Sequence, residues 1–384
     1  MSERALNVGV VGCGMMAAGT HIPLIAANAG LKLRWLCDLD VPRAKGLADR
    51  HGAAHVTADY RDVLNDPAVD FVVLATTHSL RGEFIQAAAR KGKGVYVEKP
   101  MGSTPAEIAG ILKAVRQSGI PLCVGHNRRS APAVRAAMDV LDRWRVHPQI
   151  VPWRLDRNSH LRPPLAEEEQ TLALLRVNDD ILTWKPWAFG EGIILGEMTH
   201  FLDLANLFVA RVPRRVMTMG SATTNATILV QYDDGSLATI VQSGLGTLDY
   251  PKELFEITHK GAMIALDHLV EMRVMGIPNV PFRSTFPPRE PRDFDAPGIE
   301  GFYRAAERTI AERLKTGSNE LFIGMPDKGH ARHLDLFARC VRGEGPSPCS
   351  AEEGAKATIL TLKAMESCKL GRPVDVSEGE WLAE

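Results

Sequence analysis

A carboxylate, an amine and a proline follow one another where a strongly apolar run of this 384-residue chain ends. The run is GVYV, residues 94–97, and Glu98, Lys99 and Pro100 come directly after it. A lysine held at the end of a buried strand can relay a proton or stabilise an oxyanion, whereas an exposed ion pair is the alternative interpretation. Pro100 favours the chemical role, because X–Pro bonds can be cis and a cis bond usually marks a deliberate tight turn. We therefore expect a cis Lys99–Pro100 bond that directs the lysine across the end of the sheet.

A second set of acid–base side chains lies in residues 191–208, which read EGIILGEMTHFLDLANLF. If a helix runs from Glu197 onward, Glu197, His200 and Asp203 are three residues apart and share one face, while the other positions are mostly apolar. A histidine flanked by two carboxylates can be tuned as a proton acceptor. We expect His200 to be that acceptor with Glu197 beside it. In a chain with twelve histidines, a purely structural histidine is the alternative.

The elements that would position Lys99 begin with a short β-branched run, ALNVGVV, that ends in glycines. The junction reads GCGMMA, so Gly12, Gly14 and Ala17 match the Gly-x-Gly-x-x-Ala dinucleotide fingerprint at the start of a helix-prone segment. The first glycine would permit a tight turn, the second a close approach of the pyrophosphate, and the alanine close packing of helix on strand. We expect this turn, including Met15 and Met16, to contact a dinucleotide. An ordinary glycine-rich turn is the alternative.

The next strand-like run, residues 31–38, bears on the choice of cofactor. It ends in Asp38, at the spacing expected for the acid that binds the adenosine ribose hydroxyls. That carboxylate would repel a 2′-phosphate, so the sequence favours NAD over NADP. Arg43 lies close enough to weaken this preference, although a solvated arginine on a helix is its simpler role.

Strand-like and helix-like segments alternate through the first third of the chain. The run DFVVLATT, residues 70–77, reads as a strand covered on both faces, and a helix-like segment at 80–91 leads to the strand that ends in EKP. This alternation predicts a doubly wound parallel sheet, in which ligands bind beyond the carboxyl ends of the strands. Five side chains follow two such ends and are expected to line a nucleotide crevice: Thr76, Thr77, His78, Glu98 and Lys99.

The order of these motifs resembles one known family. The fingerprint turn, Asp38, TTHSL, VEKP and VGHNRR (residues 124–129) follow one another as in the Gfo/Idh/MocA family, named for glucose–fructose oxidoreductase, inositol 2-dehydrogenase and a rhizopine-catabolism protein. The resemblance implies an N-terminal Rossmann domain, residues 1–128, and a C-terminal α/β domain, residues 129–384, with a large, mostly antiparallel open sheet. It also places Asn127 among the cofactor contacts. Most members of the family oxidise or reduce sugars, cyclitols or their derivatives with NAD(P).

The resemblance implies roles for single residues as well. The lysine that matches Lys99 is catalytic in the family, and the glutamate before it helps to shape the site. His200 matches the family's proton-handling histidine. Two positions depart from the family pattern: Arg81 stands where a histidine is frequent, and Gly196 stands where the usual acid precedes the catalytic histidine. Glu197 is then the nearest carboxylate.

Beyond the first domain the pattern changes to strand-like runs joined by short turns. YDDGS at 232–236 and HKG at 259–261 predict antiparallel hairpins. A sheet covered by helices on one face leaves its other face for a second subunit, so we expect a homo-oligomer, either a dimer or a tetramer, with a monomer as the alternative. Helix-like segments at 326–342 and 351–369 close the chain and could pack back on the first domain.

Side chains that could contact a substrate come from the middle of the chain. Tryptophan faces suit the C–H surfaces of sugars, and an arginine-rich stretch at 143–162 suits a carboxylate, sulfonate or phosphate on the substrate. Core tryptophans and a solvated loop or subunit contact are the alternatives. The residues expected to contact substrate, besides Lys99 and His200, are Arg154, Arg176, Asn178, Trp184 and Trp187. The Pro-rich stretch at 277–300 could be a lid or an arm that reaches a neighbouring subunit.

Composition limits the other possibilities. Apolar residues make up 45% and charged residues 24%, and the net charge of −1 gives no reason to expect nucleic acid or an anionic membrane as a partner. No apolar stretch approaches the ~20 residues needed to span a bilayer, and the first residues do not read as a signal peptide. The six cysteines form neither a CxxC pair nor a cluster at zinc spacing. We therefore expect a reduced cytoplasmic protein without a structural metal.

Three hypotheses for the function follow. The leading one is reversible hydride transfer between NAD and a carbon that bears a secondary hydroxyl in a carbohydrate, with Lys99 and His200 handling the hydroxyl proton. The second is an NAD-dependent glycosidase or glycoside 3-oxidase, which oxidises its substrate transiently before elimination. The third is an NAD-binding regulator without catalytic activity.

Overall fold

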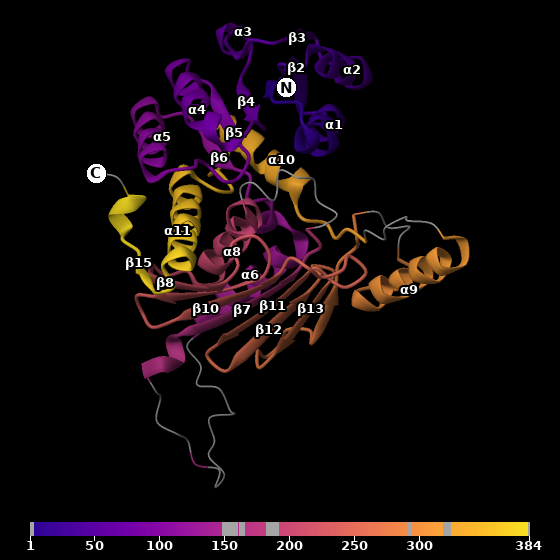
Figure 1. The fold of residues 1–384 in the computed structure, drawn as a ribbon, viewed down its shortest axis with the longest axis vertical. Coiled ribbons are helices and arrows are strands. Elements are labelled where there is room, and N and C mark those ends of the chain that lie inside the picture. Colours follow the sequence, from indigo (N-terminus) through magenta and orange to yellow (C-terminus); the bar gives the residue numbers. More distant parts are fainter. Residues whose placement is uncertain are drawn as a thin grey trace. The chain divides into compact units, whose positions relative to one another are not determined.

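The computed structural model describes residues 4–147, 160, 166–181, 192–289, 294–317 and 324–382 (Figure 1). The chain divides into two compact units. The first unit contains Met1–Asn127, His330–Ile359 and Glu378–Glu384, and the second contains Arg128–Gly329 and Leu360–Ser377. The first unit therefore combines the N-terminal third of the chain with segments close to its C-terminus.

The first unit is built on a parallel sheet of six strands in the order β3-β2-β1-β4-β5-β6. The strands are β1 (Leu6–Val11), β2 (Leu31–Cys37), β3 (His55–Thr57), β4 (Phe71–Leu74), β5 (Gly94–Val97) and β6 (Leu122–Val124). β1, β4 and β5 consist almost wholly of buried residues, because a doubly wound sheet has helices on both faces. The predicted doubly wound parallel sheet is confirmed.

Helices return the chain from the end of each strand to the start of the next. In chain order they are η1 (Ala17–His21), which continues into α1 (Ile22–Ala27), then α2 (Val41–His51), α3 (Tyr60–Asn65), η2 (His78–Leu80), which continues into α4 (Arg81–Arg90), and α5 (Pro105–Ser118). Local signals set their ends. Asp40 and Thr104 cap α2 and α5 by accepting backbone N–H bonds, and Gly52 and Gly119 end the same helices at positive φ.

A helix from the C-terminal region completes the first unit. α10 (His330–Val341) packs on the parallel sheet through Phe337, whose ring lies edge-on to Phe71 and Tyr96 at centroid distances of 5.3 and 6.0 Å. α11 (Ala351–Leu370) follows, and its N-terminal part belongs to the first unit and its C-terminal part to the second. Both helices match the helix-like segments predicted near the C-terminus.

The second unit is built on a sheet of nine strands in the order β14-β13-β12-β11-β7-β10-β9-β8-β15 (Figure 1). The strands are β7 (Thr171–Asn178), β8 (Pro213–Gly220), β9 (Ala226–Tyr232), β10 (Leu237–Ser243), β11 (Glu253–His259), β12 (Ala262–Asp267), β13 (Glu271–Met275), β14 (Arg283–Thr285) and β15 (Val374–Asp375). All neighbours pair antiparallel except β7 and β10, which pair parallel. The predicted large, mostly antiparallel sheet is confirmed.

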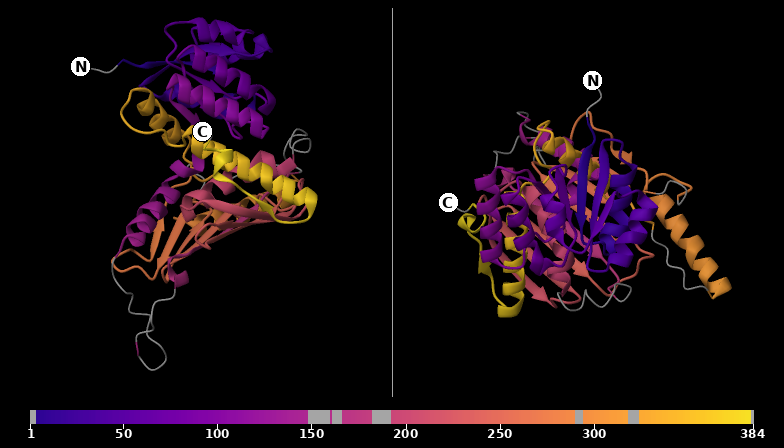
Figure 2. Two further views of the ribbon diagram at one scale, coloured as in Figure 1. Left: turned by 90° about the vertical axis from the view of Figure 1, so that its left-hand side faces the viewer. Right: turned by 90° about the horizontal axis from the view of Figure 1, so that it is seen from above.

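Helices of the second unit cover one face of this sheet (Figures 1 and 2). They are α6 (Pro132–Arg145), η6 (Ile194–Met198) and α8 (Thr199–Val209). Phe201 and Phe208 of α8 each lie 6.0 Å from the ring of Phe255 on β11. α9 (Ile299–Thr316), which the sequence patterns did not predict, follows the Pro-rich stretch and projects beyond the β13 side of the sheet.

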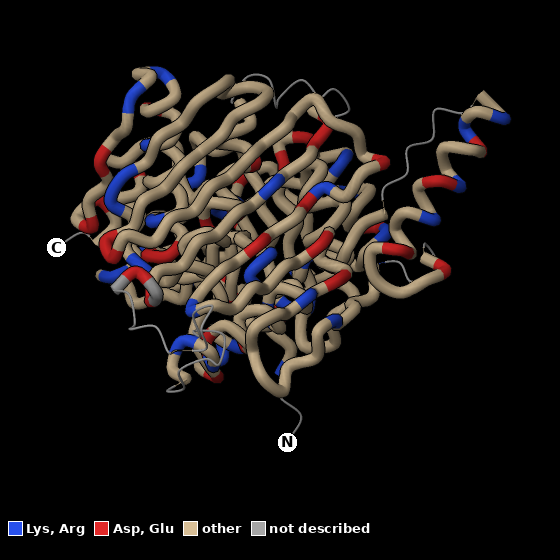
Figure 3. Tube along the Cα trace, turned by 90° about the horizontal axis from the view of Figure 1, so that it is seen from below, with Lys and Arg blue, Asp and Glu red and all other residues tan. Residues whose placement is uncertain are grey.

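The other face of the nine-stranded sheet carries exposed apolar side chains. In β9 every second residue is exposed, and Leu229 is 40% exposed. Val241 of β10 and Leu172 of β7, on the same face, are 40% and 52% exposed. Figure 3 shows Lys and Arg residues intermixed with Asp and Glu residues over these strands. Neither sign of charge predominates. This face is mixed in character, with apolar side chains along the centre of the sheet.

Within the described ranges, no helix is both long and apolar enough to cross a membrane, and no group of three or more His, Cys, Asp and Glu side chains is arranged to hold a metal ion.

Candidate active site

The fingerprint turn lies between β1 and the start of η1. Gly12 has a φ of 90°, and a Cβ added to it would stand 2.7 Å from the carbonyl oxygen of Ala75. A Cβ added to Gly14 would meet no atom within 4 Å, and Ala17 is fully buried against the sheet. The turn therefore leaves open space beside Gly14, next to the first helical N–H groups, where a phosphate could lie. These residues fit a dinucleotide.

Asp38 braces this turn. Its Oδ2 accepts a 2.6 Å hydrogen bond from the N–H of Cys13, and its Oδ1 accepts one from the N–H of Asp40 at 2.8 Å. The carboxylate predicted to bind ribose is thus fixed against the glycine turn. Arg43 pairs with Asp40 at 2.9 Å and its side chain is half-exposed, so the guanidinium lies in an ion pair on the helix. Met15, at the helix start, is 54% exposed.

The segment after β4 contains Thr76, Thr77 and His78. Thr77 is exposed, and the other two are partly buried. Burial, together with the charges of Arg81 and Lys99, lowers the pKa of His78 to about 3. His78 is therefore a neutral imidazole at physiological pH, able to donate or accept a hydrogen bond but not to contribute charge.

Glu98 is buried behind the lysine. Its Oε1 lies 2.7 Å from Nε2 of His21, and both side chains are almost fully buried. Burial would raise the pKa of Glu98, but the hydrogen bond and charge of His21, with the charges of Lys99 and Arg81, lower it to about 2. A Cβ at Gly125 would stand only 3.3 Å from this carboxylate oxygen, so the glycine of VGHNRR makes room for Glu98.

Lys99 lies at the carboxyl end of β5 and is partly exposed. Its peptide bond to Pro100 is cis, so that prediction is confirmed. β5 is hydrogen-bonded to β4, which in turn is hydrogen-bonded to β1. The fingerprint turn, the segment at 76–78 and Lys99 therefore follow the ends of three adjacent parallel strands, at one edge of one sheet.

Arg81, which the sequence marked only as a departure from the family pattern, is tied to both of these loops. It is 4% exposed, and its guanidinium donates to the carbonyl oxygens of Thr76 and Pro100. This role carries no sequence signal, because a buried arginine that bridges two loops and a solvated arginine at the start of a helix have the same sequence pattern.

In the second unit, Glu197 and His200 lie where the turns of η6 pass into α8, and both are 5% exposed. Glu197 Oε1 lies 2.8 Å from Lys252 Nζ and 3.2 Å from Arg128 Nη2. Asp203 accepts two hydrogen bonds from Arg129, at 2.7 and 2.8 Å. Both carboxylates that share a helix face with His200 are therefore engaged by cations.

Glu197 belongs to a larger buried ion network, formed by Asp179, Glu197, Glu253, Arg128, Lys252 and Lys328. Lys252 Nζ also lies 2.6 Å from Asp179 Oδ2, and Arg128 Nη2 lies 2.7 Å from Glu253 Oε1. Burial would raise the pKa of Glu253, but the charges of Arg128 and Lys328 lower it to about 2. Burial lowers the pKa of Lys328 to about 8, against the opposing charge of Glu253. Glu253 could have signalled this network, since it occupies a buried-face position in the alternating strand ELFEITH.

Arg176 and Asn178 of β7 hold the connection between β10 and β11. Arg176 donates to the carbonyl oxygen of Pro251 at 3.1 Å, with its guanidinium 4.9 Å from the ring centre of Tyr250. Asn178 Nδ2 donates to the carbonyl oxygen of Thr247 at 2.7 Å. Their substrate contacts stay a prediction.

Other predicted substrate residues lie outside the described residues: Arg154, Trp184 and Trp187. Two members of the arginine-rich stretch lie at the end of α6, and their side chains are bonded to other residues of the protein. Arg143 donates to the carbonyl oxygen of Asp139, and Arg145 pairs with Asp142 and donates to the carbonyl oxygen of Phe208. An anion site in this stretch also stays a prediction.

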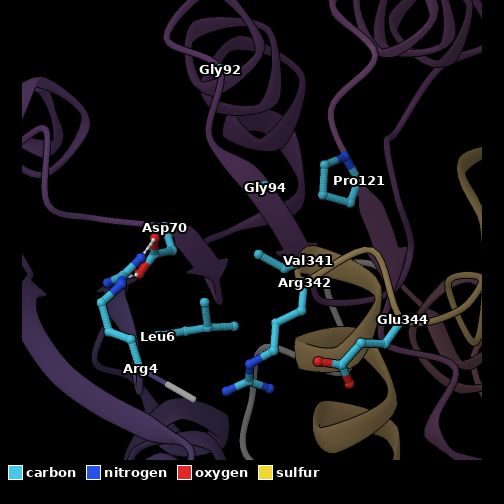
Figure 4. Close-up of a pocket in the computed structure, with 9 residues that line it drawn as sticks. All are labelled: Arg4, Leu6, Asp70, Gly92, Gly94, Pro121, Val341, Arg342 and Glu344. Carbon is cyan, nitrogen blue, oxygen red and sulfur yellow. Dashed lines mark hydrogen bonds and ion pairs between the residues drawn. The ribbon is translucent and has the colours of Figure 1, made fainter. Parts of the chain in front are cut away.

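A hollow of about 600 Å³ lies at the amino-terminal edge of the parallel sheet (Figure 4). Its lining residues are Arg4, Leu6, Asp70, Gly92, Gly94, Pro121, Val341, Arg342 and Glu344. Arg4 and Asp70 form an ion pair at 2.6 Å across part of it. The hollow contains none of the predicted site residues, which follow the carboxyl ends of the same strands.

The chain is similar in sequence to known oxidoreductases. Residues 6–126 match the model of an oxidoreductase family described by its NAD-binding Rossmann fold. The uncharacterized oxidoreductase YrbE of Bacillus subtilis is 23% identical over 391 residues, covering 99% of this chain and 99% of that protein. Inositol 2-dehydrogenase 2 of Saccharopolyspora erythraea is 33% identical over 181 residues, covering 47% of this chain and 53% of that protein.

A solved structure extends the comparison of folds. The crystal structure of scyllo-inositol dehydrogenase from Lactobacillus casei with bound NAD(H) and scyllo-inositol aligns with a TM-score of 0.69 at 16% identity. The alignment covers 97% of this chain and 99% of that chain. At this identity it shows a shared fold over both units.

Proposed function

We propose that this chain is a member of the Gfo/Idh/MocA family of NAD-binding oxidoreductases and that it oxidises or reduces a hydroxyl-bearing carbon of a sugar, cyclitol or related derivative with NAD. The supporting observation is the meeting of the fingerprint turn, the 76–78 segment and Lys99 at one edge of one parallel sheet. When bound, NAD supplies the hydride-transfer chemistry. The side chains of this protein then bind and orient the cofactor and the substrate, and they handle the proton.

In the first unit, Gly12, Gly14 and Asp38 hold the dinucleotide in this proposal, and Lys99 meets the substrate. In the oxidation direction the ammonium of Lys99 donates a hydrogen bond to the reacting oxygen and stabilises alkoxide character there, while the hydroxyl proton is taken by the second proton-handling group. Glu98, ionised and buried next to the lysine in the chain, keeps the local charge favourable for an ammonium. The negative charge of Asp38 would repel a 2′-phosphate, so this residue favours NAD over NADP.

In the second unit, we assign substrate binding to the region around His200, with His200 as the second proton-handling group. Arg176 and Asn178 remain candidates for substrate contact. Glu197 has a supporting role instead of a proton-transferring one, because its carboxylate already binds Lys252 and Arg128. It orients the turn that leads into α8 and thereby the start of the helix that bears His200.

The experiment that tests the function compares the wild-type protein with Lys99→Ala. Purified protein is incubated with NAD and a panel of inositols, aldoses and their derivatives, and NADH formation is followed by absorbance. For an oxidised substrate, Lys99→Ala should lower kcat by about 10²- to 10⁴-fold. NADH binding, measured by fluorescence titration, should change little, because the glycine turn and Asp38 are intact.

Lys113→Ala is the matched control, because Lys113 is exposed on α5, away from the strand ends. It should behave as wild type. Unchanged turnover of Lys99→Ala would contradict the assignment of Lys99. Release of an aglycone from a glycoside without net NADH would replace the dehydrogenase proposal by one of transient oxidation and elimination.

We also propose that the open face of the nine-stranded sheet joins copies of this chain. Exposed apolar residues line the centre of that face, with Leu229, Val241 and Leu172 on adjoining strands. Charges of both signs share this face, such as Glu256 and Arg273 by strand register, so that the face can be complementary to itself across a two-fold axis.

A further inference from the structure

Arg81 is the first residue of α4, and its guanidinium joins two loops that leave adjacent strands. Nε and Nη2 donate to the carbonyl oxygen of Thr76, at 3.2 and 2.9 Å, in the segment that follows β4. Nη1 donates to the carbonyl oxygen of Pro100, at 2.5 Å, in the loop that follows β5. One fork thus holds together the loop with the predicted cofactor contacts and the loop that bears Lys99.

The neighbouring residue makes a second connection between the same two places. The N–H of Gly82 donates to Glu107 Oε1 at 2.9 Å, and the N–H of Ser103 donates to Glu107 Oε2 at 2.7 Å. A Cβ on Gly82 would stand 2.5 Å from Glu107 Cγ, so only glycine allows the carboxylate to approach the helix start. The start of α4 is therefore bound to the loop after β5 at Pro100 directly and at Ser103 through Glu107.

An arginine has properties here that a lysine lacks. Its planar guanidinium presents donors in fixed directions, so it can bond two carbonyl groups of different loops at once. The side chain is 4% exposed, and a buried guanidinium without these acceptors would be costly. The fixed directions of the guanidinium N–H groups thus constrain the positions of the Thr76 and Pro100 carbonyl groups relative to each other.

We propose that Arg81 is the positioning residue for Lys99: it fixes the lysine-bearing loop relative to the loop at 76–78, and so sets the place of the amine relative to the cofactor. The catalytic consequence rests on the function proposed above, whereas the mechanical coupling of the two loops does not. Arg81 need not touch substrate or cofactor for this role.

The test uses Arg81→Ala, with Arg81→Lys as the conservative variant and Arg90→Ala as the control from the exposed end of the same helix. Misplacement of a reacting group by about 1 Å costs on the order of 10²-fold in rate, so Arg81→Ala should lower kcat by about 10- to 100-fold. KM for the substrate and the Kd of NADH should change much less. Arg81→Lys should keep the charge and the fold but lose most of the same kcat, and Arg90→Ala should equal wild type.

Guanidinium ion at concentrations below those that unfold the protein provides the specific readout. It should enter the space left in Arg81→Ala and restore part of kcat, but it should not restore Lys99→Ala. A general loss of fold would not respond in this way. Wild-type kcat in both Arg81 variants would overturn the proposal.

Hydrogen–deuterium exchange of the peptide that contains Met101 and Ser103 decides the coupling without any turnover. Both N–H groups have side-chain acceptors, Thr358 and Glu107. Exchange of this peptide should be faster in Arg81→Ala than in wild type and Arg90→Ala, and slower again with guanidinium. If wild type oxidises no polyol, the proposed function fails while this result still supports the coupling. Unchanged exchange would overturn the positioning role whether or not the protein is an active dehydrogenase.

Discussion

Gly12 and Gly14 stand two residues apart in one turn but are required for different physical reasons. Gly12 adopts a positive φ, and a Cβ there would collide with the backbone of Ala75. Gly14 faces open space, so nothing in the protein itself excludes a side chain there. The first glycine is therefore needed by the fold, and the second is needed by whatever occupies the space beside it.

Alanine substitutions should separate these two requirements. Gly14→Ala should leave the thermal unfolding temperature close to that of wild type but weaken NADH binding by about tenfold or more, which corresponds to about 1.4 kcal/mol. Gly12→Ala should lower both the unfolding temperature and NADH affinity. Thermal scans and fluorescence titrations on both variants measure the two effects. Undiminished NADH affinity in Gly14→Ala would place the pyrophosphate elsewhere.

At the scale of residues, sequence motifs predict those features that depend only on residues close together in the chain. The cis bond at Lys99–Pro100 was predictable from two adjacent residues, and the place of Thr76, Thr77 and His78 after a strand was predictable from the apolar run before them. The partners of Glu197 were not, because Lys252 and Arg128 lie 55 and 69 residues away in sequence. Only the folded sheet brings them together. For the same reason Arg81 could be recognised as unusual but not as a bridge.

At the scale of elements, the buried ion network connects Arg128, in the η3 turn (Asn127–Ser130), with β7, η6 and β11. Its Arg128 begins the second unit, Asp179 follows β7, Glu197 lies in η6, and Glu253 begins β11. Removing one cation from such a network leaves buried carboxylates without compensation, which is far more damaging than breaking an exposed pair.

Lys252→Met should therefore destabilise the protein by about 3–5 kcal/mol, because Asp179 and Glu197 both lose their ammonium partner. Arg135→Met is the control, since Arg135 forms an exposed pair with Asp139 on α6, and it should cost less than about 1 kcal/mol. Urea unfolding followed by fluorescence gives both values. A cost for Lys252→Met as small as that of the control would show that the network contributes little to stability.

The strands themselves were partly predictable. Alternation and turn residues indicated the hairpins β9–β10 and β11–β12, which join strands that are close in sequence. The centre of the sheet was not predictable in this way. β7 has the same alternation, but its neighbours β10 and β11 are set by competition among strands far along the chain. α9 was not predicted, because the Pro-rich stretch before it has no helical pattern that marks where the helix begins.

At the scale of the whole molecule, the proposed interface on the open sheet face can be tested through the state of association. The double variant Leu229→Asp with Val241→Asp should shift the protein from an oligomer to a monomer, because it buries two like charges of each subunit in the proposed interface. Light scattering coupled to size-exclusion chromatography measures the mass. Val146→Asp, at a position 81% exposed after α6, is the control and should keep the wild-type mass. A wild-type monomer would contradict the proposed interface.

The central place of β7 also matters during synthesis. The strand leaves the ribosome well before β10 and β11, which form its two sides in the finished sheet. Until they are made, the apolar side chains Ala173, Leu175 and Val177, buried in the final fold, belong to a strand with two bare edges. Because unpaired strand edges can pair between chains, we expect translation arrest in this interval to favour aggregation of the released chains.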